Sequence, residues 1–237
     1  MKIGGLQKFS LLDYPGHLAA IVFIEGCNFR CPFCYNPMLV WPRVSKLPYQ
    51  KDRPQISKDD LFVFLKKRKG KLEAVVITGG EPTMSKDLPQ LIKKIKDMGY
   101  LIKLDTNGTN PDMLALLIKN NLFDYVAMDI KASENKYSQA TGVRADLSRI
   151  KKSIKILIDG NLAYEFRTTV VPGLIDKDDI KKMGEMIRGA EKWYIQQFQN
   201  NTELVDQSFK KTKPYSRKEL KKMVDLGKKY VRQCFLR

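Results

Sequence analysis

The sequence predicts an α/β fold in which six parallel strands, each followed by a helix, form an incomplete (β/α)6 TIM-like barrel. Short runs rich in β-branched residues alternate with amphipathic helical patterns along nearly the whole chain. Residues that start and stop helices separate these runs. Six strand-and-helix units are fewer than the eight of a closed barrel, so we expect a lateral opening.

The predicted strands are apolar on both faces, which is typical of strands buried in a parallel sheet. Parallel neighbours require right-handed crossover connections, so each strand should be followed by a helix that crosses back over the sheet. The six strands are AAIVFI (19–24), EAVVIT (73–78), YLIKLD (100–105), DYVAMD (124–129), YEFRTTVV (164–171) and KWYIQQF (192–198).

The predicted helices carry recognisable terminal residues. Ser57 opens SKDDLFVFLKKRKG, which has an acidic first turn and is closed by Gly70. Ser85 opens SKDLPQLIKKIKDMG, and Gly99 closes it. The remaining signals are Asn110 and Pro111 at one helix start, Gly160 after one helix end, and Ser216 at the start of a closing helix predicted over 216–235.

Length and composition favour a single domain of residues 1–237 in the cytoplasm. Hydrophobic residues make up 43% of the 237 residues, and neither a membrane-spanning run nor a signal-peptide core is present. The net charge of +17 is compatible with nucleic acid or an acidic protein partner. The lysines fall mostly on the solvent faces of predicted helices, without an RNA-binding signature, so we do not expect a nucleic-acid function.

Three of the four cysteines, Cys27, Cys31 and Cys34, have the spacing C-x3-C-x2-C. Such close neighbours cannot form a disulfide framework, which indicates a metal-binding or redox-active cluster. Three thiolates suit an iron–sulfur cluster with one open iron, or a zinc site. Zinc would need a fourth ligand, and neither His17 nor Cys234 lies at motif spacing, which favours the iron–sulfur cluster. We interpret His17 as a turn residue and Cys234 as a thiol on the closing helix.

Loops of unusual composition follow the predicted strands at their carboxyl ends, where α/β folds bind ligands. Gly79 and Gly80 would let the backbone approach a ligand closely, and Glu81 would place a carboxylate beside it. A tight strand-to-helix connection explains the same turn. The loops are EGCNFRCPFC, TGGEPT (78–83), DTNGT (105–109), DIKA (129–132) and TVVPG (169–173).

Together these residues resemble the radical S-adenosylmethionine superfamily, whose signature is C-x3-C-x-Φ-C with an aromatic Φ, here Phe33. GGEP matches its second motif. The opening LQKFSLLDYPGHLAAIVFIEGCNFRCPFCYNP is similar to the activating proteins of anaerobic ribonucleoside-triphosphate reductases and to pyruvate formate-lyase activating enzyme. The similarity extends through DTNG, MDIKA, RTTVVPG, and YIQQF followed by KPYS. Tyr35 replaces a histidine that many relatives have, outside the ligand positions.

The resemblance implies that Cys27, Cys31 and Cys34 hold three irons of a [4Fe–4S] cluster. The amino and carboxylate groups of S-adenosylmethionine would chelate the fourth iron. Glu81 would accept a hydrogen bond from the methionine amino group. The other residues that the resemblance assigns to this part of the cofactor site are Phe33, Gly79, Gly80 and Pro82.

A second implied site is a monovalent-cation site beside the cofactor. Two carboxylates aimed at one point repel each other unless a cation lies between them. Hydrogen-bonded strand-end caps are the alternative interpretation. The residues concerned are Asp105, Thr106, Asn107, Met128 and Asp129.

The resemblance also assigns charged and substrate-facing residues. Lys131, counted with the cysteines as catalytic, and Arg167 would direct positive charge at the methionine carboxylate or ribose, although either could form an ordinary salt bridge. Val171 and Pro172 would pack near the adenine. Asp13 would lie near the bound substrate loop, while a plain turn explains DYPG equally well.

The implied activity is reductive cleavage of S-adenosylmethionine to a 5′-deoxyadenosyl radical, with flavodoxin or ferredoxin as electron donor. The radical would take hydrogen from a glycine Cα of an anaerobic ribonucleotide reductase. The alternatives are another glycyl-radical enzyme such as pyruvate formate-lyase, a small-molecule substrate, or a non-catalytic zinc-binding module.

Overall fold

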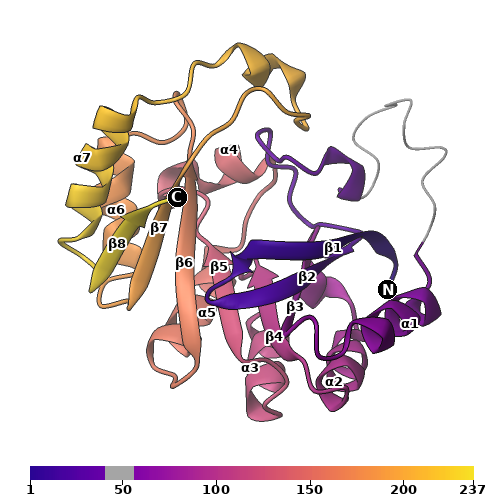
Figure 1. Cartoon of the computed structure of the whole chain (residues 1–237). Coiled ribbons are helices and arrows are strands. Elements are labelled where there is room, and N and C mark those ends of the chain that lie inside the picture. Colours follow the sequence, from indigo (N-terminus) through magenta and orange to yellow (C-terminus); the bar gives the residue numbers. More distant parts are fainter. Residues whose placement is uncertain (41–55) are drawn as a thin grey trace. The chain divides into compact units, whose positions relative to one another are not determined.

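The computed structural model describes residues 1–40 and 56–237 (Figure 1). Its strands are β1 Ile3–Tyr14, β2 His17–Ile24, β3 Ala74–Gly79, β4 Leu101–Thr106, β5 Tyr125–Asp129, β6 Ala163–Val170, β7 Lys192–Gln197 and β8 Gln233–Leu236. Its α-helices are α1 Lys58–Arg68, α2 Leu88–Asp97, α3 Pro111–Lys119, α4 Tyr137–Thr141, α5 Leu147–Ile158, α6 Lys177–Met186 and α7 Arg217–Gly227. Single 3-10 turns occur at Pro37–Leu39, Pro82–Met84, Glu134–Lys136 and Gln207–Lys211.

The strands form one eight-stranded sheet whose order follows the chain from β1 to β8. Strand β1 pairs antiparallel with β2, whereas β2, β3 and β4 are parallel neighbours, as are β6, β7 and β8. Helices alternate with the parallel strands, as crossover connections require. The predicted fold class is therefore confirmed, an α/β fold with the mainly parallel sheet of an incomplete TIM-like barrel.

Two compact units make up the chain. Unit 1 contains Met1–Asn28, Met38–Thr106 and Asp112–Val126, and unit 2 contains Phe29–Pro37, Asn107–Pro111 and Ala127–Arg237. Strand β5 contributes residues to both. In unit 1, the apolar faces of α1 and α2 are buried, and in unit 2 those of α5, α6 and α7 are buried. That the chain is a single domain stays a prediction.

All six predicted strands are present, each within two residues of its predicted ends. Several helix signals also act as expected. Ser57 and Ser216 form capping boxes with Asp60 and Glu219, in which each serine side chain accepts the N–H of the third helical residue. Helix α2 starts later than the sequence predicts: its N-cap is Asp87, whereas Ser85 is the C-cap of the 3-10 turn at Pro82–Met84.

The sequence prediction missed β1. This strand does not alternate cleanly, because its pairing with β2 has register shifts between Gln7 and Ser10 and between Ser10 and Tyr14. The hairpin turn that follows contains Pro15 and Gly16, and Gly16 has a φ of +78°. Proline followed by a glycine with positive φ suits a type II turn, so DYPG does form a turn. His17, interpreted as a turn residue, is the first residue of β2.

The prediction of one long closing helix over 216–235 is wrong in its second half. Helix α7 ends at Gly227, and β8 pairs in parallel with β7, where Cys234 lies opposite Trp193. Gly227 permits this packing, since a Cβ at that position would lie 2.6 Å from the Cys234 sulfur. Cys234 is therefore a buried thiol on a strand and not on a helix.

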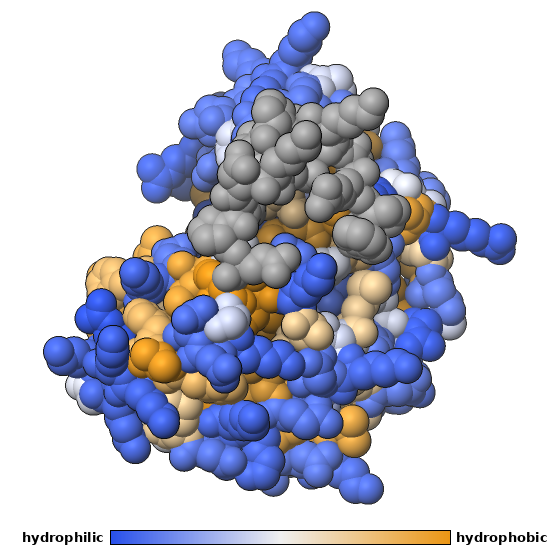
Figure 2. All heavy atoms as spheres, turned by 90° about the vertical axis from the view of Figure 1, so that its right-hand side faces the viewer, coloured by the Kyte–Doolittle hydropathy of each residue, from blue (hydrophilic) through white to orange (hydrophobic). Residues whose placement is uncertain are grey.

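The surface agrees with the composition. Figure 2 shows one face on which hydrophilic side chains cover most of the area and apolar patches interrupt them. None of the helices in residues 1–40 and 56–237 has the length and apolar character that a bilayer crossing requires.

Candidate functional site

The cysteine loop follows β2 and has no regular secondary structure around its thiols. Cys27, Cys31 and Cys34 are all free of disulfides. The Cys34 N–H donates to the Cys31 carbonyl at 3.1 Å, and the Asn36 N–H donates to the Cys34 sulfur at 3.4 Å. A backbone N–H directed at sulfur favours a thiolate, which is the ligating form of cysteine.

Burial raises the pKa of the Cys34 thiol, while the Asn36 N–H and the positive charge of Lys131 act in the opposite direction. Burial alone would lower the pKa of Lys131, but Asp129, Cys31 and Cys34 together raise it well above its usual range. Lys131 therefore stays protonated within electrostatic reach of two of the three thiols.

Asp129 holds two cationic side chains at the end of β5. Its carboxylate accepts hydrogen bonds from Lys131 Nζ and Arg167 Nε, each at 2.9 Å. The Ile130 N–H donates to the Arg167 carbonyl at 2.8 Å, which fixes the two strand ends against each other. Burial would raise the pKa of Asp129, but the two cations hold it well below its usual range. The three side chains carry a net charge of +1, which suits an anionic ligand group.

The Gly-Gly-Glu turn packs against the chain that leads into the cysteine loop. A Cβ on Gly80 would lie 2.0 Å from the Gly26 carbonyl oxygen, and a Cβ on Gly79 would lie 2.3 Å from the Ile24 nitrogen. Gly79 also has a φ of +122°, which favours glycine. The close backbone approach that these glycines allow is therefore made to residues 24–26 of the protein itself.

Glu81 is buried and caps the 3-10 turn that begins at Pro82. Its Oε1 accepts hydrogen bonds from the Thr83 N–H at 3.1 Å, from Thr106 Oγ1 at 2.7 Å and from the Thr83 hydroxyl. The turn after β3 is thus a tight strand-to-helix connection, as one of the two interpretations of the sequence predicted. The predicted role of Glu81 toward a methionine amino group stays a prediction.

The residues predicted for a monovalent cation form separate contacts within each unit. Asp105 is paired with Lys103, whose ammonium is buried and 2.5 Å away. Asn107 Oδ1 accepts hydrogen bonds from the Thr109 N–H at 3.0 Å and from its hydroxyl at 2.6 Å, which is a strand-end cap. Asp105 and Asp129 each have a cationic side chain of the protein beside them. Repulsion between the two carboxylates is therefore a weaker argument for a bound cation. The monovalent-cation site stays a prediction.

The loop of residues 107–109, which follows β4, accepts hydrogen bonds from two side chains of helix α5. The sequence analysis did not predict these contacts. Ser153 Oγ donates to the Gly108 carbonyl and Arg149 Nε donates to the Thr109 carbonyl, both at 2.7 Å. Gly108 has a φ of +76°, and a Cβ there would lie 2.0 Å from the Met128 methyl carbon. The two side chains lie one helical turn apart, but nothing in the sequence distinguishes them from ordinary helix residues.

Three further predicted residues lie in well-defined surroundings. Asp13 accepts a hydrogen bond from the Ser10 hydroxyl in the irregular part of β1, beside the exposed side chain of Leu12. Phe33 is buried, and Val171 has no exposed surface. Their roles toward substrate or cofactor stay predictions.

The structure gives no support for His17 or Cys234 as the fourth ligand of a zinc site. His17 Nδ1 lies 2.5 Å from Glu73 Oε2, and burial raises the pKa of Cys234 to about 12. Among the described residues, no three His, Cys, Asp or Glu side chains are grouped as a ready metal site. The fit of an iron–sulfur cluster therefore rests on the chemistry of three cysteines outside any disulfide, a backbone N–H at sulfur and a nearby ammonium group.

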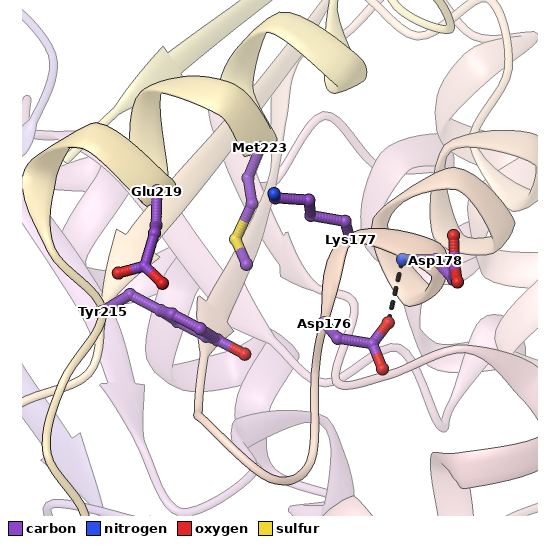
Figure 3. A pocket seen from close by; sticks show the side chains of 6 residues that line it. All are labelled: Asp176, Lys177, Asp178, Tyr215, Glu219 and Met223. Atoms are coloured by element: carbon purple, nitrogen blue, oxygen red, sulfur yellow. Dashed lines mark hydrogen bonds between the residues drawn. The ribbon is translucent and has the colours of Figure 1, made fainter.

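A pocket in unit 2 does not include any predicted site residue. It lies at the N-termini of α6 and α7, and Figure 3 shows the Asp176 carboxylate directed at the backbone of α6. Asp176 accepts the Asp178 N–H at 2.8 Å, and the Tyr215 hydroxyl donates to the Ile175 carbonyl at 2.9 Å. These contacts serve as helix caps, and we assign no ligand to the pocket. It is lined by Asp176, Lys177, Asp178, Tyr215, Glu219 and Met223.

Known proteins resemble the chain in sequence. The family model of the Radical SAM superfamily matches residues 21–187. A Methanocaldococcus jannaschii protein named as a candidate glycyl-radical enzyme activating enzyme is 34% identical over 240 residues, which is 99% of this chain and 95% of the relative. The pyruvate formate-lyase-activating enzyme of Streptococcus mutans is 28% identical over 194 residues, which is 78% of this chain and 72% of that enzyme.

Solved structures also resemble the chain in fold. Streptococcus suis SuiB, in a crystal structure with S-adenosylmethionine bound, matches with a TM-score of 0.64 and 16% identity. The match covers 92% of this chain and 51% of SuiB. At this level of identity the likeness concerns the fold alone.

Proposed function

Because the chain belongs to the radical S-adenosylmethionine superfamily, and within it to the glycyl-radical enzyme activating enzymes, we propose that it generates a glycyl radical on an anaerobic ribonucleotide reductase. Enzymes of this superfamily use a [4Fe–4S] cluster and S-adenosylmethionine, and this chain is such an enzyme. The observation that carries the choice of target is the segment LQKFSLLDYPGHLAAIVFIEGCNFRCPFCYNP, which is similar to the activating proteins of these reductases.

In this proposal Cys27, Cys31 and Cys34 hold the cluster. When bound, the cluster supplies the electron that cleaves the sulfonium of S-adenosylmethionine. The cationic pair on Asp129 orients the methionine carboxylate, because Lys131 and Arg167 together outweigh the single negative charge between them. Glu81 receives the methionine amino group, whose positive charge a buried carboxylate favours.

The second candidate target is pyruvate formate-lyase. The similarity to the Streptococcus mutans enzyme supports it. The chemistry required of this chain is the same for both targets, so the difference lies in which protein loop the enzyme accepts. Asp13 is the residue that we propose to lie near that loop.

The proposed electron donor is a flavodoxin or ferredoxin. A net charge of +17 favours association with an acidic protein, and such association weakens as salt is added. In the same proposal the enzyme works in the cytoplasm, whose reducing conditions suit four cysteines that form no disulfide.

The test uses anaerobically reconstituted enzyme with S-adenosylmethionine, dithionite and one purified target at a time. We expect a glycyl doublet in the electron paramagnetic resonance spectrum with the anaerobic ribonucleotide reductase of the same host. The control is that reductase with its radical-bearing glycine changed to alanine. A doublet only with pyruvate formate-lyase selects the second candidate. Cofactor cleavage without a doublet on either protein contradicts both and favours a small-molecule substrate.

A further inference from the structure

Strand β4 of unit 1 carries a buried lysine. Lys103 lies in the middle of the strand, opposite Val76 of β3, and its side chain is 1% exposed. Its neighbours along the strand, Ile102 and Leu104, have no exposed surface. An ammonium group is costly to remove from water, and replacing a buried ion pair by apolar side chains is often neutral or stabilising. Stability alone therefore does not account for a charge at this position.

The partner of this ammonium group lies at the carboxyl end of the same strand. Asp105 shares a face of β4 with Lys103, because side chains two residues apart on a strand point the same way. Lys103 Nζ lies 2.5 Å from Asp105 Oδ1. The carboxylate is 12% exposed, whereas the ammonium side chain behind it is buried. Ligands of α/β folds bind at this end of the strands, so the carboxylate faces the ligand end and its balancing charge lies within the fold.

This pairing does not fit the monovalent cation that the resemblance implies beside Asp105. The chain already balances the charge of this carboxylate with an ammonium group of its own. A second cation on the same carboxylate would lie within a few ångströms of Lys103 Nζ. Like charges at that separation repel each other, and burial leaves the repulsion poorly screened.

We propose that the ammonium group of Lys103 takes the place of a monovalent cation at Asp105, so that this chain binds S-adenosylmethionine without added Na+ or K+. An ammonium group carries the same charge as K+ and is close to it in size. Lys103 is then a positioning residue that neutralises and holds the Asp105 carboxylate. The inference rests on the proposed function, which places Asp105 in the cofactor site.

The test measures S-adenosylmethionine binding by equilibrium dialysis, with anaerobically reconstituted enzyme in KCl or in choline chloride at equal ionic strength. Choline is too large to replace K+ in a small site. The wild type should have the same dissociation constant in both salts. Lys103→Met removes the charge and keeps a long side chain, so its Asp105 should require K+. We expect this variant to bind the cofactor about tenfold more tightly in KCl than in choline chloride.

Lys96→Met is the matched control. Lys96 is also in unit 1, and its Nζ lies 2.7 Å from Asp124. Asp124 accepts the Ile102 N–H at 2.8 Å, so this ion pair lies near the first residues of β4, away from its carboxyl end. The variant also deprives an aspartate of its ammonium partner, but we expect it to bind the cofactor equally in both salts.

Two results would overturn the proposal. One is a wild-type enzyme that binds S-adenosylmethionine about tenfold more tightly in KCl, which would show that a diffusible cation is required despite Lys103. The other is a folded Lys103→Met enzyme that keeps its iron and shows no response to K+. If Lys103→Met does not fold, Lys103→Gln replaces it, because its amide can still donate a hydrogen bond to Asp105. The same response to K+ is expected of that variant.

The outcome is separate from the choice of target. The binding measurements use the isolated enzyme, so failure to activate a ribonucleotide reductase leaves them unaffected. A wild-type enzyme that bound no S-adenosylmethionine in either salt would contradict the proposed function itself, and the inference would fail for that reason.

Discussion

Thr106 donates a hydrogen bond to the buried carboxylate of Glu81 over 2.7 Å, which joins the turn after β3 to the end of β4. Hydrogen bonds to charged groups contribute about 1.5 to 3 kcal/mol, and more is lost when a buried charge is left short of donors. We expect Thr106→Val, which keeps the side-chain shape, to lower the free energy of unfolding by about 2 kcal/mol. Urea denaturation of the apoprotein measures this, and an unchanged midpoint would contradict the assignment.

The proposed division of roles between thiols and Glu81 predicts two different defects. Cys31→Ala should lose both the cluster and cofactor cleavage. Glu81→Ala should keep much of the iron but bind S-adenosylmethionine about tenfold or more weakly, because a charge-assisted hydrogen bond is lost. Iron analysis and equilibrium dialysis separate the two, and an equal loss of iron in both variants would count against this division.

Gly80 should not tolerate a side chain. A Cβ there would lie 2.0 Å from the backbone oxygen of Gly26, so Gly80→Ala must displace the chain that enters the cysteine loop. We expect a loss of about 1 to 3 kcal/mol in unfolding free energy together with a lower iron content. Gly5→Ala is the control, since its nearest neighbour would be the Phe23 ring at 3.4 Å, an ordinary contact. Equal iron contents in the two variants would show that the turn does not support the loop.

The ion pairs of Asp129 should make the free energy of unfolding depend on pH in the acid range. Burial opposes ionisation, but Arg167 and Lys131 lower the folded-state pKa below the unfolded value of about 4. The ion pairs therefore stabilise the fold fully above about pH 4, and this contribution is lost as the pH falls below that value. Asp129→Asn should be less stable than wild type at pH 7 and lose less stability between about pH 4 and pH 2.

Urea denaturation of the apoprotein across this pH range provides the measurement. Asp178→Asn serves as the control, because Asp178 forms an exposed ion pair with Lys181 that should contribute little. A wild-type profile that matches Asp129→Asn would disprove the coupling.

Cys234 should be dispensable for iron. It is buried on β8 beside Trp193, and burial raises its pKa to about 12, so it has little thiolate character at neutral pH. Cys234→Ala should keep the full iron content of the wild type. A loss of about a quarter of the iron would indicate a remote ligand.

The sequence predicted the central strands because their signal is local. Runs such as EAVVIT are apolar on both faces, and this pattern alone separates a buried parallel strand from its surroundings. Strand β8 has no such run, and the helical pattern of the sequence predicts a helix that continues through its first residues to 235, whereas α7 ends at Gly227. At its C-terminal end α7 packs closely on Trp193, 34 positions earlier in the chain, where a Cβ on Gly227 would lie 3.2 Å from the Trp193 ring.

The same distinction applies to the candidate site. Cysteine spacing and the GGEP turn are short motifs, so the sequence carries them in full. The edge-to-face contact of Tyr137 with Phe29 of the cysteine loop joins residues about a hundred positions apart, and Ser153 reaches Gly108 from another helix. Tertiary contacts of this kind produce no motif or periodic pattern along a single sequence, so they could not be predicted.

The irregular pairing of β1 has a consequence for solubility. β1 is the outermost strand at its end of the sheet order, and a flat outer strand would offer its free N–H and C=O groups to other molecules. The register shifts on either side of Ser10 make this edge strand irregular. An irregular edge disfavours continuous pairing with a strand of another molecule. A deletion within residues 11–13 that makes β1 regular should therefore increase aggregation. The cysteine loop, which follows β2, is not changed by such a deletion.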